Sequence, residues 1–375
     1  MLIWQKPGCS QQVRKVNNIY NKICDFDTII SMYKNIKKAV KNKSKIIRFE
    51  EFYTYNINKI YNTLKNKTYI PGKYNIFLIK KPKYRIVMAQ NIRDKVINHL
   101  VAKYLIIDVV EKTLIEQNIA TRINKGTHYG IKLLKQYLVK IIKENKQVYA
   151  LKIDIHKFFY SLDHQIIKEL LSNKIKDKDA LSTIYKIVDS TDEEYVNKEI
   201  KKYKEREIKL LENSNLKNKY KLISEVDNIP YYKKGKGLAI GNMTSQILAI
   251  FYLNELDHYI KETLRVKYYI RYQDDMVILS TDKQYLIECL NKIKIVIEKY
   301  KLKTNNKTQI INVSKNGIDF LGFHYYIRDK RIIMKLRNST KEKLKHCIKT
   351  KDNQNSYYAH LKHGNCYNLY KKYMG

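Results

Sequence analysis

Acidic residues are scarce in this chain of 375 residues. Asp and Glu total 36 against 74 Lys and Arg, which gives a formal net charge of +38. A charge of this size and sign indicates a polyanionic partner, most simply a nucleic acid. Mutational bias in an AT-rich genome would explain the abundance of Lys, Asn, Ile and Tyr, but it does not obviously explain the shortage of acids.

Cysteines and long apolar runs are also few. The five cysteines are odd in number, scattered and without a CxxC pair (Cys9, Cys24, Cys289, Cys347 and Cys366). This pattern argues against a disulfide framework or a zinc site and favours a reducing compartment, and the nine histidines add no metal-ligand spacing. The chain starts without an apolar signal segment, and no window reaches the roughly 18 apolar residues of a membrane span. We therefore expect a cytoplasmic protein with no membrane partner.

The first hundred residues are mostly expected to be helical. Residues 1–45 are polar and weakly periodic, so we expect an N-terminal extension of short helices or irregular chain. Apolar residues recur at three- and four-residue steps over 46–66 and again from Asn91, which predicts two helices. Arg93 and Asp94 lie in the first turn of the second helix. They form either a structural pair or, through Arg93, a contact with a template.

Residues 74–88 predict a β-hairpin with a basic turn. Two apolar stretches flank a turn that contains lysines and Pro82, as is typical of two strands and their connection. Lys80, Lys81 and Arg85 could close over a triphosphate, with Arg85 offering a bidentate fork. An ordinary hairpin with a solvated tip fits the same pattern.

A second basic loop, residues 122–128, precedes a helix predicted over 129–143. Gly126 and the adjacent helix N-terminus would suit a phosphate group, and Arg122 and Lys125 add positive charge beside them. A plain helix-capping turn is equally compatible with these residues.

The strand predicted over 148–155 ends on a carboxylate. The segment is compact and apolar, and it presents Asp154 near its end. Carboxylates are disfavoured in strands, so one at the end of a buried strand favours a functional interpretation. Residues from about 190 to 230 are helical and densely charged. We expect an exposed helical insertion there, without a catalytic role.

A glycine-rich loop, residues 235–246, opens a helix predicted to run to about residue 261. Its glycines allow close approach by a ligand, and Asn242 and Thr244 are candidate N-caps. Residues 283–300 predict an amphipathic helix, and a further hairpin is expected in 317–336. The residues after it are basic and helical.

Asp274 and Asp275 lie at the expected turn of a hairpin within Arg271–Ser280. Neighbouring carboxylates repel each other, so a fold gains little from placing them together. Divalent cations reverse that preference, because hard metals such as Mg²⁺ take carboxylate oxygens as ligands. The pair alone is weak evidence, since in a Lys-rich chain such residues usually form a solvated surface.

The order of elements favours the metal interpretation. A strand with Asp154, helices, a hairpin with Asp274 and Asp275 and a further helix follow the order of a ferredoxin-like split βαβ sheet. In that sheet the strand and the hairpin are neighbours, so three carboxylates would converge. They could hold two Mg²⁺ ions, or Mn²⁺ in their place, about 4 Å apart for in-line phosphoryl displacement.

Four segments, in order, resemble motifs of reverse transcriptases. Asp154-Ile155-His156-Lys157-Phe158-Phe159 and Tyr272-Gln273-Asp274-Asp275 resemble the two metal-binding motifs. The basic hairpin resembles the fingers motif, and Phe320-Leu321-Gly322-Phe323 resembles the start of the primer grip. The resemblance implies an RNA-directed DNA polymerase with an α+β right-hand fold. It would have fingers (46–147), a ferredoxin-like palm (148–325) and a primer-grip end with a short helical thumb (326–375).

The resemblance also implies roles for single residues. Phe159 matches the steric gate that excludes a ribose 2′-hydroxyl and so implies dNTP substrates, although a core Phe is the alternative. Lys307 lies near the position of a lysine proposed to protonate pyrophosphate. The metal would be held by Asp154, Ile155, Asp274 and Asp275. Other nucleotide contacts would come from Lys80, Lys81, Arg85, Ile240, Gly241 and Gln246. Contacts with the template RNA and the cDNA or primer would come from Arg93, Arg122, Lys125, Gly126, Tyr272, Leu321 and Gly322.

The segment Ile240-Gly241-Asn242-Met243-Thr244-Ser245-Gln246 points to a subgroup. Many reverse transcriptases have Gln-Gly and Ser-Pro at the two ends of this motif. This chain has Ile-Gly and Ser-Gln and so resembles the enzymes of diversity-generating retroelements, as does its segment 359–365. The resemblance implies low fidelity opposite template adenines, a structured template RNA and a small basic helical accessory protein.

Two alternatives stay open. A stand-alone bacterial reverse transcriptase of an anti-phage defence system would share the palm and its chemistry and differ in template and role. A catalytically idle RNA-binding protein built on the same palm would need no metal. All three aspartates are present, which favours an active polymerase.

Overall fold

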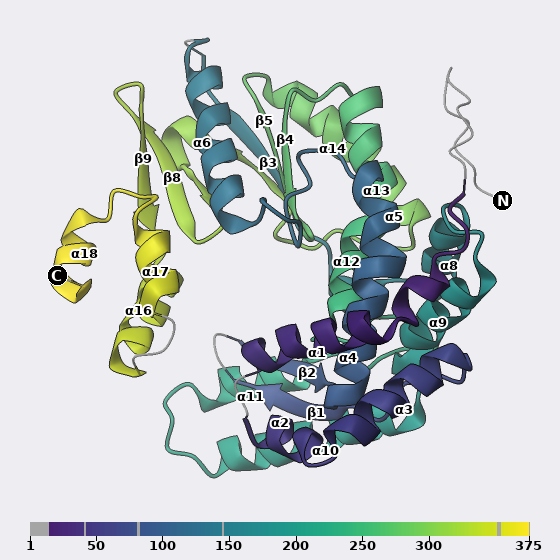
Figure 1. Cartoon of the computed structure of the whole chain (residues 1–375). Helices are drawn as coiled ribbons and strands as arrows, with labels where there is room; N and C mark the ends of the chain where they lie inside the picture. Colours follow the sequence, from purple (N-terminus) through teal and green to yellow (C-terminus); the bar gives the residue numbers. More distant parts are fainter. Residues whose placement is uncertain (1–14, 41–42, 81–82, 145, 351–353, 375) are drawn as a thin grey trace.

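Figure 1 shows a computed structural model in which residues 15–40, 43–80, 83–144, 146–350 and 354–374 are described. The strands of the central sheet and α6 lie together at the top of the view, and the N-terminal helices lie below them with a small hairpin. The last three helices form an arm at the left. Among the described helices, none is long and apolar enough to cross a membrane.

The N-terminal region is helical, and its helices pack through their apolar faces. Its elements are η1 (Tyr20–Ile23), α1 (Phe26–Ala39), α2 (Lys43–Glu50), α3 (Tyr53–Lys65), α4 (Ile92–Leu100), η2 (Val101–Ile107), α5 (Asp108–Val110) and η3 (Glu111–Thr113). The prediction of one helix over 46–66 is wrong, because α2 and α3 are separated at Phe52. The bend lets Tyr33 of α1 contact both Phe49 and Tyr53, with ring centroids at 4.9 and 5.5 Å.

The predicted hairpin is confirmed as β1 (Asn75–Ile79) and β2 (Arg85–Ala89), paired antiparallel. The helical insertion packs against it, so the expectation of a merely exposed insertion is wrong. Ile76 and Ile86 of the hairpin share a buried cluster with Val196 and Ile200 of α10 (Glu194–Glu212). This contact follows from the apolar stripe that α10 carries among its charges.

The central sheet has the strand order β4-β5-β3-β6, and all neighbours are antiparallel. The strands are β3 (Tyr149–Ile153), β4 (Tyr268–Tyr272), β5 (Asp275–Ser280) and β6 (Gln309–Asn312). The predicted neighbourhood of β3 and the β4–β5 hairpin is confirmed. The edge strand β6 was not predicted, because its four residues include only two apolar ones and are too few to show a period.

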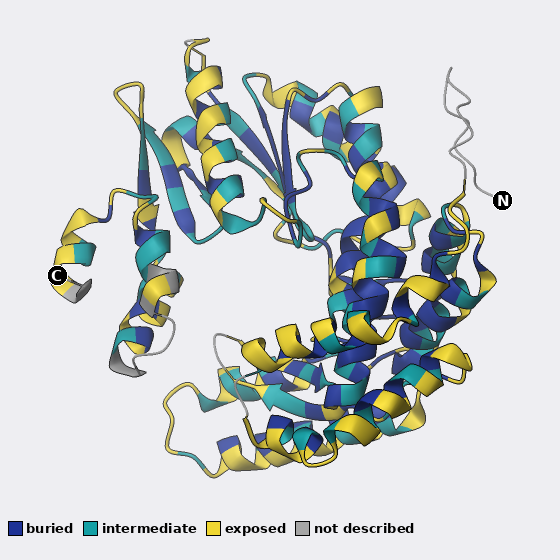
Figure 2. Cartoon of the chain, in the orientation of Figure 1, coloured by how far each residue is buried: buried dark blue, intermediate teal, exposed yellow. Residues whose placement is uncertain are grey.

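Helices cover both faces of this sheet. Leu151 and Ile278 belong to the same buried cluster as Ile293 of α14 (Lys283–Lys299). The alternate positions Ala150 and Val277 belong to a second cluster, with Leu134 of α6 (Thr127–Ile142). Figure 2 shows buried residues along the strands of this sheet. Burial of both faces explains why the strands are continuously apolar.

The helices between β3 and β4 lead into the glycine-rich loop and out of it. They are α7 (Phe158–Ser161), α8 (His164–Ser172), α9 (Lys178–Val188), η4 (Asp189–Thr191), α10, α11 (Lys219–Asp227), α12 (Met243–Tyr252), α13 (Asn254–His258) and η5 (Tyr259–Thr263). The helix expected to run to about residue 261 is interrupted at Leu253, between α12 and α13. Asn242 is the N-cap residue of α12, but its side chain makes no capping hydrogen bond, and Thr244 lies within the helix. Asn242 donates from Nδ2 to the Tyr74 hydroxyl at 2.9 Å, and the Thr244 hydroxyl accepts from Asn98 Nδ2 at 2.9 Å.

The C-terminal region contains the expected hairpin and one more strand. The strands β7 (Ile318–Phe320), β8 (Phe323–Arg328) and β9 (Arg331–Leu336) form an antiparallel sheet in that order. Leu321 and Gly322 make the tight turn between β7 and β8, with φ values of 45° and 88°. The helices α15 (Val313–Asn316), α16 (Asn338–Thr350), α17 (Gln354–Leu361) and α18 (Tyr367–Met374) complete the chain.

Candidate active site

The structure brings the three predicted aspartates to one end of the central sheet. In the β3–β5 register, Ile153 pairs with Met276. Asp154 therefore leaves β3 beside the start of β5, where Asp275 lies. Asp274 is in the turn that precedes it, closed by the pairing of Tyr272 with Asp275. The convergence predicted from the order of elements is thus present.

These carboxylates are in an environment that disfavours their negative charge. Burial, together with the charges of Asp154 and Asp275, raises the pKa of Asp274 to about 6. Burial also raises the pKa of Asp275, although Lys152 lies 3.4 Å away and opposes the shift. The Asp275 oxygen that faces Lys152, Oδ1, is buried. A cation would relieve each of these costs.

Asp154 is oriented by the loop before β6. Asn305 donates from Nδ2 to Asp154 Oδ2 at 2.6 Å and from its backbone N–H to the Asp154 carbonyl at 2.8 Å. The Asp154 N–H donates to the Thr308 hydroxyl at 3.2 Å. The side chain of Ile155 is buried in the core, so this residue could contact a metal only through its backbone.

A buried ion pair supports the turn that carries Asp274. Arg271 is fully buried and donates from Nε to Asp257 Oδ1 at 2.7 Å. It also donates to the carbonyl of Gln273 at 2.8 Å and to that of Ile250 at 2.9 Å. Tyr269 donates its hydroxyl to Asp257 at 2.6 Å. Sequence reasoning missed this pair, although a charged residue inside an apolar strand is a signal that could have found it.

Basic side chains of the β1–β2 hairpin and of the loop before β6 act on one another electrostatically. The positive charge of Lys307, together with burial and Arg85, lowers the pKa of Lys83, and Asp154 acts in the opposite direction. Lys83 was not among the predicted site residues. Lys80 lies instead with its ammonium 2.7 Å from Glu207 of α10, and Lys81 lies outside the described residues.

The model of the family described as "Reverse transcriptase (RNA-dependent DNA polymerase)" matches residues 73–325, which hold the carboxylates, the basic hairpin and the central sheet. The chain belongs to the reverse transcriptase family. With the observed sheet, this membership confirms the α+β right-hand polymerase fold.

Solved structures similar to this reverse transcriptase include two yeast telomerases. One is the telomerase of Candida albicans in complex with a fragment of telomeric RNA, with a TM-score of 0.43 and 12% identity over 77% of this chain and 49% of that one. The other is the apo telomerase of Candida tropicalis, with a TM-score of 0.47 and 14% identity over 76% of this chain and 60% of that one. The chain thus spans about half to three-fifths of these telomerase chains. No curated protein matches it.

In this member of the family, the glycine-rich loop is hydrogen-bonded to the β1–β2 hairpin. The carbonyl of Ile240 accepts a hydrogen bond from the Met88 N–H at 2.8 Å. Gly241 has a φ of 123°, and a Cβ there would lie 3.0 Å from the Met88 carbonyl oxygen. Gln246 is exposed on α12. The conformation and the close contact with β2 together require glycine at position 241.

Phe159 lies in α7, five residues after Asp154 in the chain. It is half-buried, packs against the main core and contacts Phe158 with ring centroids 5.8 Å apart. Its carbonyl accepts from the Leu238 N–H at 2.8 Å, which joins it to the glycine-rich loop. This packing fits a core Phe. The role of Phe159 as a steric gate stays a prediction.

Several predicted nucleic-acid contacts have structural partners in this reverse transcriptase. Arg93 donates to Asp94 at 2.8 Å, which gives it the structural role that was one of its two interpretations. Arg122 is nearly buried and donates to Glu111 at 2.7 Å and to the carbonyls of two neighbouring residues. Lys125 donates to the Glu116 carbonyl at 2.7 Å.

The other predicted nucleic-acid contacts lie at a helix N-cap, at a strand end and in a turn. Gly126 is the N-cap of α6 with a φ of 95°, Tyr272 ends β4, and Leu321 and Gly322 form the β7–β8 turn. Contact of these residues with nucleic acid stays a prediction.

The raised pKa of Asp274 predicts that cation binding depends on pH. Below about 6 its carboxyl is protonated in the metal-free protein, and a proton competes with the cation. We expect the affinity for Mn²⁺, measured by electron paramagnetic resonance, to change little above pH 7 and to fall as the pH drops below 6. The D274N variant should lack this step. Because the folded-state pKa is raised, the group's contribution to metal-free stability is present at low pH and lost as the pH rises through about 6.

Proposed function

We propose that this protein is an RNA-directed DNA polymerase that transfers nucleotides from dNTPs to a DNA 3′ end on an RNA template. The observation that carries the proposal is the convergence of Asp154, Asp274 and Asp275 at one end of the central sheet. The positive charges of Lys83, Arg85 and Lys307, which act on one another electrostatically, would add a site for a triphosphate. Acidic and basic groups are therefore adjacent, as phosphoryl transfer to a growing strand requires.

Mg²⁺ ions fit the residues present, and Mn²⁺ could replace them. The convergence of three carboxylates and the raised pKa values of Asp274 and Asp275 support a site for a cation. Asp154, Asp274 and Asp275 would hold the ions. When bound, Mg²⁺ lowers the pKa of the attacking hydroxyl and neutralises charge on the leaving pyrophosphate.

The side chains around the metal site would bind and select the nucleotide. Arg85 and Lys83 would bind phosphate oxygens, Arg85 through its bidentate fork. Lys307 would add positive charge near the leaving group. Phe159 would exclude a 2′-hydroxyl, because an aromatic ring occupies the space that the hydroxyl would need.

The direct test is dNTP incorporation by the purified protein on its co-purifying RNA with Mg²⁺, followed by sequencing of the cDNA. Labelled products that depend on RNA, dNTPs and Mg²⁺ would support the proposal, and ribonucleotides should be used poorly. Absence of incorporation on the co-purified RNA and on a primed homopolymer would contradict it. Such a result would favour an idle RNA-binding protein.

We further propose that the enzyme is the error-prone polymerase of a diversity-generating retroelement. The motif from Ile240 to Gln246 supports this branch, because Ile240 replaces a side chain that could form hydrogen bonds near the nascent base pair. Its partners would be a structured RNA and a small basic helical accessory protein, in the cytoplasm. Faithful or untemplated products would instead favour the anti-phage alternative.

Replacing Ile240 with Gln is expected to lower the error rate opposite template adenines. The glutamine amide restores hydrogen-bonding groups beside the nascent pair, so mismatched geometry is rejected more strongly. One added contact of about 1 kcal/mol would change discrimination about fivefold. Deep sequencing of cDNA would measure the errors, with I240L as the control of similar size. An adenine error rate in I240Q equal to that of I240L would contradict the retroelement proposal and leave the polymerase proposal intact.

A further inference from the structure

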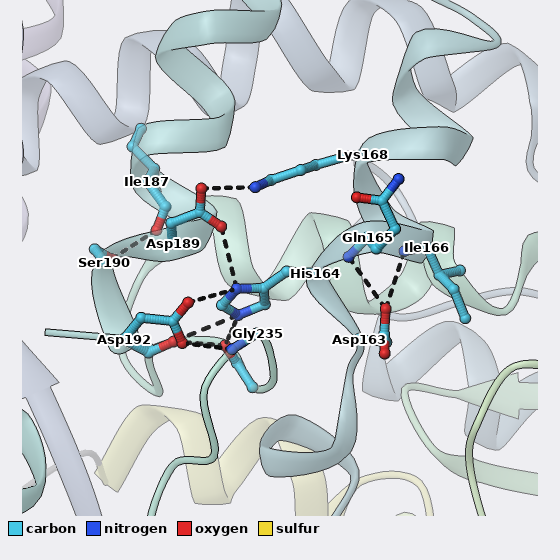
Figure 3. A network of polar contacts seen from close by, with 12 residues as sticks. Asp163, His164, Gln165, Ile166, Lys168, Ile187, Asp189, Ser190, Asp192 and Gly235 are labelled. Carbon is cyan, nitrogen blue, oxygen red and sulfur yellow. Dashed lines mark hydrogen bonds and ion pairs between the residues drawn. The ribbon is translucent and has the colours of Figure 1, made fainter.

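A second group of potential metal ligands lies in the helical region between the palm strands. His164 is the first residue of α8, and Asp189 and Asp192 lie in and just after η4. Figure 3 shows both carboxylates pointing toward the imidazole ring. His164 Nδ1 is 3.2 Å from Asp189 Oδ1 and 3.5 Å from Asp192 Oδ2. The chain separates these residues, so no short ligand motif reveals them.

The hydrogen bonds of His164 fix the state of its two nitrogens. Nε2 lies 2.7 Å from the carbonyl oxygen of Gly237, which can only accept, so Nε2 carries a proton. The side chain is 3% exposed, and its buried Nδ1 has no hydrogen-bond partner. Carboxylates also only accept, so the Nδ1 lone pair of a neutral ring points at two negative groups. Only a second proton or a cation between the three groups removes that repulsion.

Outer partners orient the two carboxylates, although one of them, Lys168, also offsets part of the negative charge of Asp189. Asp189 Oδ2 lies 2.6 Å from the ammonium of Lys168, and Asp192 Oδ1 accepts from the Gly235 N–H at 2.9 Å. Each carboxylate is thus held by one oxygen, while its other oxygen faces Nδ1. Nδ1 itself is oriented by the bond that Nε2 donates to Gly237. Metal-binding histidines and carboxylates are commonly held by outer partners of this kind.

The distances from Nδ1 to the two inward carboxylate oxygens are close to the ligand spacing of a tetrahedral ion. Zn²⁺ binds nitrogen and oxygen at about 2.0–2.2 Å, which places tetrahedral neighbours about 3.3–3.6 Å apart. The two distances from Nδ1, 3.2 and 3.5 Å, are close to this range. All three ligand atoms lie within 4.8 Å of one another. The side chains of Asp189 and Asp192 are 41% and 24% exposed, so a fourth position can be taken by water.

We propose that His164, Asp189 and Asp192 form a divalent-cation site selective for Zn²⁺ over Mg²⁺, separate from the three palm aspartates. An imidazole ligand favours Zn²⁺, whereas Mg²⁺ prefers an all-oxygen set. The ion would be structural. It would join α8 and η4 to the loop at Gly235 and Gly237, which leads to Ile240 and Gly241. The proposal does not depend on the polymerase activity.

The test measures bound Zn²⁺ by elemental analysis after exposure to a chelator, reloading and removal of excess metal. The wild type and D274N should each retain the ion, and D192N should lose it. In D192N the new side-chain amide can still accept from Gly235 and can donate to Nδ1, so this variant should fold, as circular dichroism would verify. Equal Zn²⁺ content in the wild type and D192N would overturn the proposal. No retained Zn²⁺ in the wild type would overturn it too and leave a protonated His164 ion pair.

A second variant, K168M, should raise the affinity for Zn²⁺, whereas D192N should abolish Zn²⁺ binding. Lys168 competes with a cation for Asp189 and repels it, so K168M should bind Zn²⁺ more tightly, by about tenfold for roughly 1.4 kcal/mol. Partial unfolding could not produce such a gain. Zn²⁺ should also raise the melting temperature of the wild type and K168M but not of D192N. An unchanged or weaker affinity in K168M would contradict the assigned ligand set.

Discussion

Replacing Asp274 with Asn is expected to lower the rate of dNTP incorporation by about 10³-fold, the size of effect seen when a preorganised electrostatic contact is removed. The change keeps the shape of the side chain and removes one of three charges that converge at the end of the central sheet. Asp274 is also the carboxylate whose pKa is raised to about 6. Its replacement therefore weakens cation binding and relieves buried negative charge at once. Single-turnover incorporation on a primed RNA template would measure the loss.

The matched control is D227N, which makes the same chemical change at a side chain that is 77% exposed in the insertion. It should retain wild-type activity. The D274N protein should also be at least as thermally stable as the wild type without metal, because a disfavoured charge has been removed. An active D274N enzyme would exclude the proposed metal site, and an unfolded one would contradict the electrostatic explanation.

Replacing Arg271 with Met is expected to destabilise the fold by about 3–5 kcal/mol, the cost of breaking a buried ion pair from one side. Asp257 would stay buried with the Tyr269 hydroxyl as its remaining donor at this site. The carbonyls of Gln273 and Ile250 would each lose the hydrogen bond from the guanidinium. Urea denaturation would measure the change in the free energy of unfolding.

Two further variants separate a lost charge pair from lost packing. The exposed pair of Arg328 with Asp329 provides the control, and R328M should cost less than about 1 kcal/mol. The double variant R271M/D257L should recover part of the stability, because it removes the unpaired carboxylate. A double variant no more stable than R271M would show that packing of the arginine, rather than its charge, holds the turn.

The helices and strands with strong apolar periodicity could be predicted from the sequence. The β1–β2 and β4–β5 hairpins, α6 and α14 all lie where the pattern places them. Three errors share one cause. The break between α2 and α3 at Phe52, the interruption at Leu253 and the strand β6 depend on which neighbours those segments contact. Local propensity does not contain that information.

The packing of the charged insertion, residues 190–230, also could not be predicted from local propensity. A helix rich in Lys and Glu was expected to lie in solvent, yet Lys204 and Glu207 of α10 are buried. Glu207 takes Lys80, a predicted phosphate contact, as its partner. Lys83, which was not predicted, interacts electrostatically with Asp154. Which lysine of a basic turn reaches the site depends on strand twist and on the packing partner, neither of which is visible in a run of like residues.

The sequence by itself determined the chemistry of this protein: three aspartates in ordered motifs, a basic hairpin and a net charge of +38. Residue types and short spacings carry that information because hard metals favour carboxylate oxygens and phosphates favour cationic side chains. Only the tertiary structure decided which side chains support them. It paired Arg271 with Asp257, joined Ile240 to Met88 and gathered His164 with Asp189 and Asp192. Such partners are chosen by burial, because a charged or polar group removed from water must find its complement wherever the folded chain brings one.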